Sequence, residues 1–224
     1  MKRYAFYVSG NAGRLKQFLE SGYFLNCSSQ ISLVLSDNPK DTSLKNMLEG
    51  HSIHIHYFDL SEFNRSTQNI NLSDFLHHLL QEYSVDYCFV FGGRILEGEI
   101  LSSFKNRLIN FHPSVLPAFK GQNSIDQAVK DKSFLLGNTA HFIVREVDSG
   151  PIIMQSIFHN SNSGSMMQLL NLQVPMLAQI IRWLNENRVF FSDGYALIKD
   201  ASYETGLFIP RLDSDIHAEF ILQN

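Results

Sequence analysis

Residues 86–92 have the sequence DYCFVFG, a nearly continuous run of apolar side chains that ends in glycine. A strand buried on both faces of a parallel sheet has this composition, whereas a half-exposed strand alternates polar and apolar residues. Similar strand-like runs recur along the first half of the chain, and helix-like segments separate them. We expect strands at 4–9, 31–36, 53–57, 86–92 and 107–111, and helices at 12–21, 42–48, 73–83 and 97–104.

This alternation predicts βαβ units and therefore an α/β fold with a doubly wound, mostly parallel (Rossmann-like) sheet. Ser73 is expected to cap the third of these helices. The second half differs, because strand-like segments at 139–146 and 151–159 are separated by only four residues and predict an antiparallel pair. The longest helix is expected at Met166–Asn185, followed by short strands and loose ends over Val189–Asn224.

Composition excludes several classes of protein. The 224 residues carry 18 Lys and Arg against 22 Asp and Glu, so no strongly basic surface for nucleic acid is expected. The apolar runs are too short to cross a bilayer. The basic start, Met1–Arg3, precedes only a short apolar run, so we expect no targeting segment. Two cysteines, Cys27 and Cys88, fit a reducing cytoplasm.

A polar pair stands at the end of the strand expected at 107–111. Asn110 and His112 are two residues apart, so on a strand they point to the same side, and Pro113 then ends the ladder. Ligands bind at such strand ends in open α/β sheets. An amide that can bind an oxyanion beside an imidazole that can move a proton suits acyl-type transfer. The alternative is that Asn110 caps the strand and His112 packs in a turn.

Asp148 lies between the two strands of the expected antiparallel pair, followed by Ser149-Gly150-Pro151. A carboxylate placed near His112 would orient the imidazole and stabilise its charged form. Alternatively, Asp148 binds only the backbone of its own turn. The residues alone do not place it beside His112.

The segments NFHPSVLPAFKG (110–121), QAVKDK (127–132) and GNTAHFIVREVDSGPIIMQ (137–155) resemble the core of the folate-dependent formyltransferases. That family includes glycinamide ribonucleotide transformylase, nucleotide-sugar N-formyltransferases and methionyl-tRNA formyltransferase. The resemblance extends from the first strand to about Leu184. It implies a formyltransferase catalytic domain over 1–190 and a short C-terminal extension over 191–224.

The resemblance also implies the site. Asn110, His112 and Asp148 would form a catalytic triad that transfers a formyl group from 10-formyltetrahydrofolate to an amine, without a metal. Gly92-Gly93 fits a backbone that approaches a flat ring closely. Main-chain groups of two segments would hold the pterin ring: Arg94, Ile95 and Leu96, and Val144, Arg145, Glu146 and Val147.

The acceptor side departs from the family pattern. The first strand–helix turn, with Gly10, Asn11, Gly13 and Arg14, resembles a loop that holds a substrate phosphate in glycinamide ribonucleotide transformylases. Those enzymes continue the loop as Gly-Ser-Asn and carry a ribose-binding Glu, where this chain has Ala12-Gly13-Arg14 and Gln173. Because an Arg suits a diphosphate, we favour a nucleotide-linked amino sugar, as in O-antigen biosynthesis, over glycinamide ribonucleotide.

Other functions remain alternatives. A formate-releasing hydrolase uses the same triad but usually has an added N-terminal regulatory domain. A catalytically silent folate-binding module would not need the triad. A transfer-RNA formylase would carry a basic C-terminal domain. His54 and His56 share a strand face but lack further ligands, so no metal is expected. The resemblance suggests a homodimer.

Overall fold

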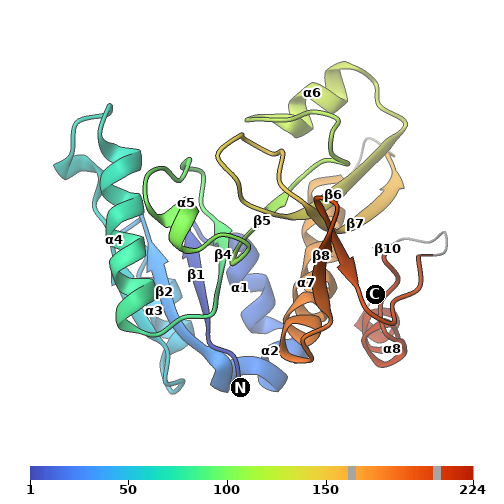
Figure 1. Ribbon diagram of the computed structural model, residues 1–224, viewed down its shortest axis with the longest axis horizontal. Coiled ribbons are helices and arrows are strands. Elements are labelled where there is room, and N and C mark those ends of the chain that lie inside the picture. Colours follow the sequence, from blue (N-terminus) through green and yellow to red (C-terminus); the bar gives the residue numbers. More distant parts are fainter. Residues whose placement is uncertain (161–164, 204–207, 224) are drawn as a thin grey trace. The chain divides into compact units, whose positions relative to one another are not determined.

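The computed structural model describes residues 1–160, 165–203 and 208–223 (Figure 1), and it divides into two compact units. The first contains Met1–Ile109 and Ile143–Arg145, and the second contains Asn110–Phe142 and Glu146–Asn224. Strand β5, Leu108–His112, begins in the first unit and ends in the second. The expected division into 1–190 and 191–224 stays a prediction, as does the dimer.

The first unit alternates strands and helices as the sequence predicts. Short 3-10 turns follow two of these elements, η1 at Ser28–Gln30 and η2 at Leu60–Glu62. The strands are β1 (Tyr4–Val8), β2 (Ile31–Ser36), β3 (His54–Tyr57) and β4 (Tyr87–Phe91), and the helices are α1 (Gly13–Glu20), α2 (Gly22–Cys27), α3 (Thr42–Leu48), α4 (Gln68–Glu82) and α5 (Ile100–Ser103).

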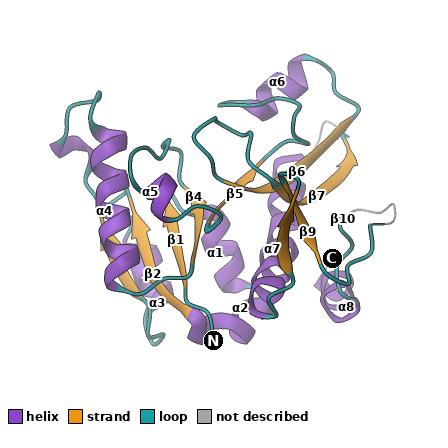
Figure 2. Cartoon of the chain, viewed as in Figure 1, coloured by secondary structure: helices purple, strands orange, loops and turns teal. Residues whose placement is uncertain are grey.

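The strands of this unit form a parallel sheet in the order β4-β1-β2-β3, with the start of β5 beside β4. Central strand β1 is buried at every position, and helices cover both of its faces. Phe6 contacts Phe18 of α1, which contacts Phe24 of α2. The opposite face, which carries Ala5 and Tyr7, packs against α4 and α5. The unit is therefore doubly wound (Figure 2).

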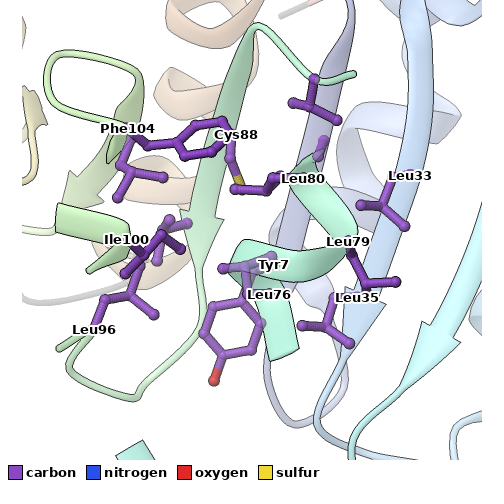
Figure 3. Close-up of a cluster of buried hydrophobic side chains, with 14 of the residues drawn as sticks. Tyr7, Leu33, Leu35, Leu76, Leu79, Leu80, Cys88, Leu96, Ile100 and Phe104 are labelled. Carbon is purple, nitrogen blue, oxygen red and sulfur yellow. The ribbon is translucent and has the colours of Figure 1, made fainter. Parts of the chain in front are cut away.

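The core under α4 contains leucines from the helix and alternate residues from three parallel strands. In Figure 3, Leu79 lies between Leu33 and Leu35 of β2. Leu80 lies beside Cys88 of β4 in the same view. Tyr7 belongs to the same cluster, and its hydroxyl points away from Cys88 and Phe104. A fully buried tyrosine hydroxyl requires a partner, and Tyr7 finds one in Asp37, whose Oδ2 lies 2.8 Å away.

The second unit contains the antiparallel part of the fold. Here β6 pairs with β7 in antiparallel register, β10 pairs with β7, and the end of β5 lies beside β6. A separate hairpin is formed by β8 and β9. The elements are α6 (Ser124–Lys130), β6 (Leu135–Phe142), β7 (Ile152–His159), α7 (Ser165–Asn185), β8 (Val189–Ser192), β9 (Tyr195–Ile198), β10 (Phe208–Ile209) and α8 (Ser214–Gln223).

The fold class is confirmed, and four local predictions are wrong. Helix α4 begins at Gln68, so Ser73 is not its cap: its buried hydroxyl donates to the Asn69 carbonyl and accepts from the Glu97 N–H. Helix α5 is only four residues long. Strand β6 ends at Phe142, four residues early, which leaves a longer loop before β7. The tail contains helix α8 as well as strands.

Gly92 has a packing reason that its sequence context did not reveal. A Cβ atom at this position would lie 2.1 Å from Cε1 of Tyr7, far inside any real contact distance. The flat ring that this backbone approaches is therefore Tyr7. Gly93 differs, because its Cβ would meet only the Ser9 hydroxyl, at 3.8 Å.

Among the described residues, none of the helices combines the length and the apolar character needed to span a membrane.

We expect Gly92→Ala to lower the free energy of unfolding by about 1–3 kcal/mol, because the buried Tyr7 ring leaves no room for the added methyl group. Urea unfolding followed by circular dichroism measures the change. Gly93→Ala is the matched control and should cost much less. Equal stability of the two variants would contradict this packing argument.

Candidate active site

The end of β5 carries the polar pair predicted from the sequence. Both Asn110 and His112 lie on the strand, which ends one residue later than expected, so that His112 is its last residue. The His112 side chain is only 6% exposed. Its Nδ1 lies 3.3 Å from Oδ2 of Asp148, and its Nε2 lies 2.8 Å from the Phe119 carbonyl oxygen. The structure therefore brings Asp148 beside His112.

The Asp148 carboxylate is held from three directions. Its Oδ2 accepts a 2.8 Å hydrogen bond from the Gly121 N–H, in addition to facing His112. Its Oδ1 lies 3.5 Å from Nε2 of His141 on β6. The backbone of Asp148 is left-handed, with φ of +50°, a conformation that Asp tolerates better than most residues. Asp148 therefore binds groups outside its own turn, and the alternative that it binds only the backbone of that turn is wrong.

These contacts decide the ionisation of Asp148. Burial by itself favours the neutral acid and raises the pKa. The hydrogen bonds from His141 and Gly121, together with the charges of His112 and His141, outweigh burial and hold the pKa of the Asp148 carboxyl below its ordinary value of 3.8. The group is a carboxylate at neutral pH.

The surroundings of His112 favour its charged form. A carbonyl oxygen and an ionised carboxylate can only accept hydrogen bonds. Because Nε2 faces the Phe119 carbonyl and Nδ1 faces Asp148, a proton on each ring nitrogen satisfies both neighbours. The imidazolium is thus the form that this geometry stabilises.

His141 is a site residue that the sequence reasoning missed. Its side chain is 3% exposed, its Nδ1 faces the Phe142 carbonyl at 3.0 Å, and its Nε2 lies 3.4 Å from the Asn110 amide nitrogen. It therefore links Asn110 to Asp148. The available signal was the run Asn138-Thr139-Ala140-His141, in which three of four residues inside a buried strand are polar.

Thr139 lies two residues before His141 and supports the segment after His112. Its hydroxyl donates to the Ser114 carbonyl and accepts from the Leu116 N–H. Gln155 on β7 adds bonds to Thr139 and to the Leu116 carbonyl. Strands β6 and β7 therefore hold the backbone that leaves β5.

The residues expected to hold folate lie in both units. In the first, Arg94 is partly exposed, Ile95 is 46% exposed and Leu96 is buried in the core under α4, so its side chain is unavailable to a ligand. Val144 and Arg145 also belong to the first unit. In the second, Glu146 and Val147 are exposed in the loop that leads to Asp148.

The acceptor-side residues are likewise divided. In the first unit, Asn11 Oδ1 accepts from the Gly13 N–H at 3.2 Å, and the Gly10 carbonyl accepts from Asn38, so part of this loop is internally bonded. Arg14 lies over the Phe91 ring, 5.8 Å from its centroid, and burial lowers its pKa to about 10. It remains charged at neutral pH.

Gln173 lies in the second unit and is buried. Its Nε2 donates to Asn138 Oδ1 at 2.6 Å, and its Oε1 has no hydrogen-bond partner among the described residues. Asn138 in turn donates to the Leu169 carbonyl and to Ser156. Gln173 is therefore tied through its nitrogen to β6, while its oxygen is left as an acceptor.

Within the described part of the chain, no three His, Cys, Asp or Glu side chains are grouped so that they could bind a metal ion. The His56 imidazole instead pairs with the Tyr83 hydroxyl at 2.9 Å.

The sequence matches the formyl transferase family over residues 2–173. The chain belongs to that family. This formyl transferase family member is 25% identical to the phosphoribosylglycinamide formyltransferase of Haemophilus influenzae over 88% of its own length and 94% of that protein. It is 29% identical to the formyltetrahydrofolate deformylase of the same organism, over 84% of the chain and 67% of that protein.

A third relative is the human trifunctional purine biosynthetic protein adenosine-3, which is 30% identical over 68% of this chain. The match covers only 15% of the length of the human protein. Among solved structures, glycinamide ribonucleotide transformylase 1 from Symbiobacterium toebii is 26% identical, with a TM-score of 0.76 over 89% of this formyl transferase family member and 95% of that chain. A Pseudomonas syringae formyltetrahydrofolate deformylase shares the fold, with 21% identity and a TM-score of 0.74 over 89% of this chain and 67% of that one.

We expect the Asp148 carboxyl to titrate below 3.8 in the folded protein, and His141→Leu to move its midpoint upward because the hydrogen bond from His141 is lost. Carbon-13 NMR of the side-chain carboxyl measures both values. His159→Leu, at the other end of the β6–β7 pair, is the control and should leave the midpoint unchanged. A midpoint at or above 3.8 in the wild type would contradict the contact set.

The sign of the linked stability follows from the direction of this shift. A depressed carboxyl pKa stabilises the folded state above the ordinary value of 3.8, and that contribution is lost as the pH falls through the lower folded-state pKa.

Proposed function

We propose that this chain transfers a formyl group from 10-formyltetrahydrofolate to an amine, with Asn110, His112 and Asp148 as its catalytic residues. The observation that carries the proposal is the buried His112–Asp148 pair at the end of β5, in a chain of the formyl transferase family. An imidazolium held by a low-pKa carboxylate is a strong hydrogen-bond donor, which a developing oxyanion requires.

The chemistry follows from these groups. The uncharged amine attacks the formyl carbon and forms a C–N bond, which moves an electron pair to the formyl oxygen. The Nε2–H of His112 and the Asn110 amide donate hydrogen bonds to that oxyanion. When the oxyanion collapses, the C–N bond to the folate breaks, and the proton lost by the attacking amine passes to the departing nitrogen. Asp148 remains ionised and stabilises the imidazolium throughout.

One contact must change first. The Phe119 carbonyl already accepts from the nitrogen that the oxyanion needs, and Phe119 has a left-handed backbone, with φ of +53°. In the proposal, the formyl oxygen replaces the Phe119 carbonyl as the partner of His112. The exchange leaves His112 Nε2 with one hydrogen-bond acceptor before and after the donor binds.

For the acceptor, we propose a nucleotide-linked amino sugar. Arg14 is a cation on the expected phosphate loop, and a guanidinium can bind two oxygens of a diphosphate at once. The Gly13 N–H, which a single phosphate would use, is bonded to Asn11. Gln173 offers a neutral carbonyl oxygen in place of a carboxylate. These features support an acceptor other than a simple ribose monophosphate.

Two further candidates have their own support. The coverage of the Haemophilus influenzae phosphoribosylglycinamide formyltransferase, almost end to end, favours glycinamide ribonucleotide as the acceptor. The similarity to the formyltetrahydrofolate deformylase of the same organism favours water as the acceptor, with formate as product.

The deciding experiment incubates the protein with 10-formyltetrahydrofolate and either a panel of nucleotide-linked amino sugars, glycinamide ribonucleotide or no amine, and follows tetrahydrofolate and formate. We expect an amino sugar to stimulate tetrahydrofolate release without formate. Stimulation only by glycinamide ribonucleotide supports the second candidate, and formate without any amine supports the third. No reaction in any arm, with no folate binding, would overturn the proposal.

In the arm that is active, His112→Ala is expected to lower kcat by about 10²–10³-fold, because a hydrogen-bond donor to the oxyanion is lost. Stopped-flow or steady-state absorbance of the folate measures it. His78→Ala, an exposed residue of α4, is the control and should keep full activity. Full activity of His112→Ala would remove this mechanism.

Arg14→Gln is expected to raise the KM of a diphosphate-linked acceptor by about tenfold or more with a small change in kcat, because a charged contact to the phosphates is lost. Steady-state kinetics with varied acceptor measure both constants. Arg65→Gln, an exposed residue outside the expected site, is the control. An unchanged KM would contradict the role of Arg14.

A further inference from the structure

Four residues in the first unit form a continuous hydrogen-bond chain that ends on a carboxylate. The Gly93 N–H donates to the Ser9 hydroxyl oxygen at 2.5 Å. The Ser9 hydroxyl bonds the Tyr7 phenol oxygen, and the Tyr7 hydroxyl donates to Asp37 Oδ2 at 2.8 Å. In this arrangement each hydroxyl can accept one hydrogen bond and donate one, with its proton directed toward Asp37.

The direction of this chain is fixed by its charged end. A carboxylate can only accept, so Tyr7 must donate to it, and the lone pairs of Tyr7 are then free for Ser9. Burial, and next the charge of Asp37, raise the pKa of Tyr7 far above its usual range, so the phenol keeps its proton. Chains of aligned hydrogen bonds with an ionised acceptor are stronger than isolated bonds.

This hydrogen-bond chain connects three loops at the carboxyl ends of the parallel strands. Ser9 follows β1, Asp37 follows β2, and Gly93 follows β4, and these strands are neighbours in the order β4-β1-β2. Tyr7 lies on the middle strand. Its ring packs in the core under α4, and it also lies directly against the backbone of Gly92, which has no side chain to keep it away. The hydroxyl that joins the loops therefore has a fixed position.

We propose that Tyr7, with Ser9 and Asp37, is the positioning device that holds the Gly93–Leu96 loop in the conformation that binds the formyl donor. The inference rests on the proposed function, in which the main chain of Arg94–Leu96 contacts the pterin ring. Arg94 directly follows the residue whose N–H is bound by Ser9. At its other end the loop is anchored by the Leu96 side chain in the core.

A ring held through main-chain groups requires a loop that is already in place, because ordering it on binding would cost conformational entropy. Apolar packing fixes Leu96, but the exposed Gly93 end has no side chain to pack. The bond to Ser9 supplies that restraint, and Tyr7 and Asp37 orient Ser9. Removing the Tyr7 hydroxyl should therefore weaken donor binding without touching the reacting atoms.

The test compares Tyr7→Phe with Tyr4→Phe. Tyr4 is the first residue of the same strand and is equally buried, whereas Tyr7 lies near the strand end from which the loop begins, so Tyr4→Phe is a matched loss of one tyrosine hydroxyl. Isothermal titration with 5-formyltetrahydrofolate, a stable compound with the same pterin ring, measures donor-site affinity. NMR hydrogen exchange of the Gly93 amide in the ligand-free protein measures the restraint directly.

For Tyr7→Phe we expect the Kd to rise about five- to tenfold and Gly93 exchange to accelerate about tenfold, with Tyr4→Phe close to wild type in both. Ser9→Ala should weaken affinity and accelerate exchange in the same way. Ser9→Thr, which keeps the hydroxyl, should show affinity and exchange close to wild type. In turnover, the KM for the donor should rise with kcat nearly unchanged.

Unchanged affinity and unchanged exchange in Tyr7→Phe would overturn the inference, as would equal effects in Tyr4→Phe. If the wild type binds no folate, the proposed function fails on its own. Gly93 exchange then decides separately: acceleration in Tyr7→Phe alone supports the chain as the restraint on this loop, and no acceleration overturns it.

Discussion

The carboxylate of Asp148 is the group on which the geometry of the second unit depends. It binds His112 from β5, His141 from β6 and the N–H of Gly121 from the loop before α6. Burying a charged carboxylate costs free energy unless hydrogen-bond donors or cations surround it. Each segment that contacts Asp148 supplies such a donor. The end of β5, the end of β6 and the loop before α6 are thereby held at one point.

The strands that carry these groups are unusual in holding buried polar side chains. Asn138, Thr139 and His141 are all buried, yet each is hydrogen-bonded. Thr139 holds the backbone beyond β5, and Asn138 connects β6 to helix α7 through Gln173. Such networks are stable only when their members are satisfied, and among the described residues the Gln173 oxygen is an exception, because it has no hydrogen-bond partner.

Much of the first unit could be read from local pattern. The expected bounds of β2 and α3 coincide with the observed ones, and β1 and β4 differ by a residue or two at their ends. In these segments hydrophobic periodicity and capping agree with burial. Prediction failed where tertiary contacts decide the structure. Ser73 has the residue type of a helix cap, but its hydroxyl instead accepts a hydrogen bond from the Glu97 N–H. Helix α8 forms in a tail whose weak hydrophobic periodicity did not predict it.

The sequence by itself determined the order of strands and helices, the parallel sheet, and the position of Asn110 and His112 at a strand end, because these depend on side-chain periods of two and about four along a local stretch. Only the tertiary structure decided that Asp148 meets His112, that His141 joins them, and that Tyr7 requires Gly92 and reaches Asp37. Apart from the short link between His141 and Asp148, those contacts join residues from about 30 to more than 80 positions apart, and hydrogen bonding and close packing over such separations leave no periodic trace in the chain.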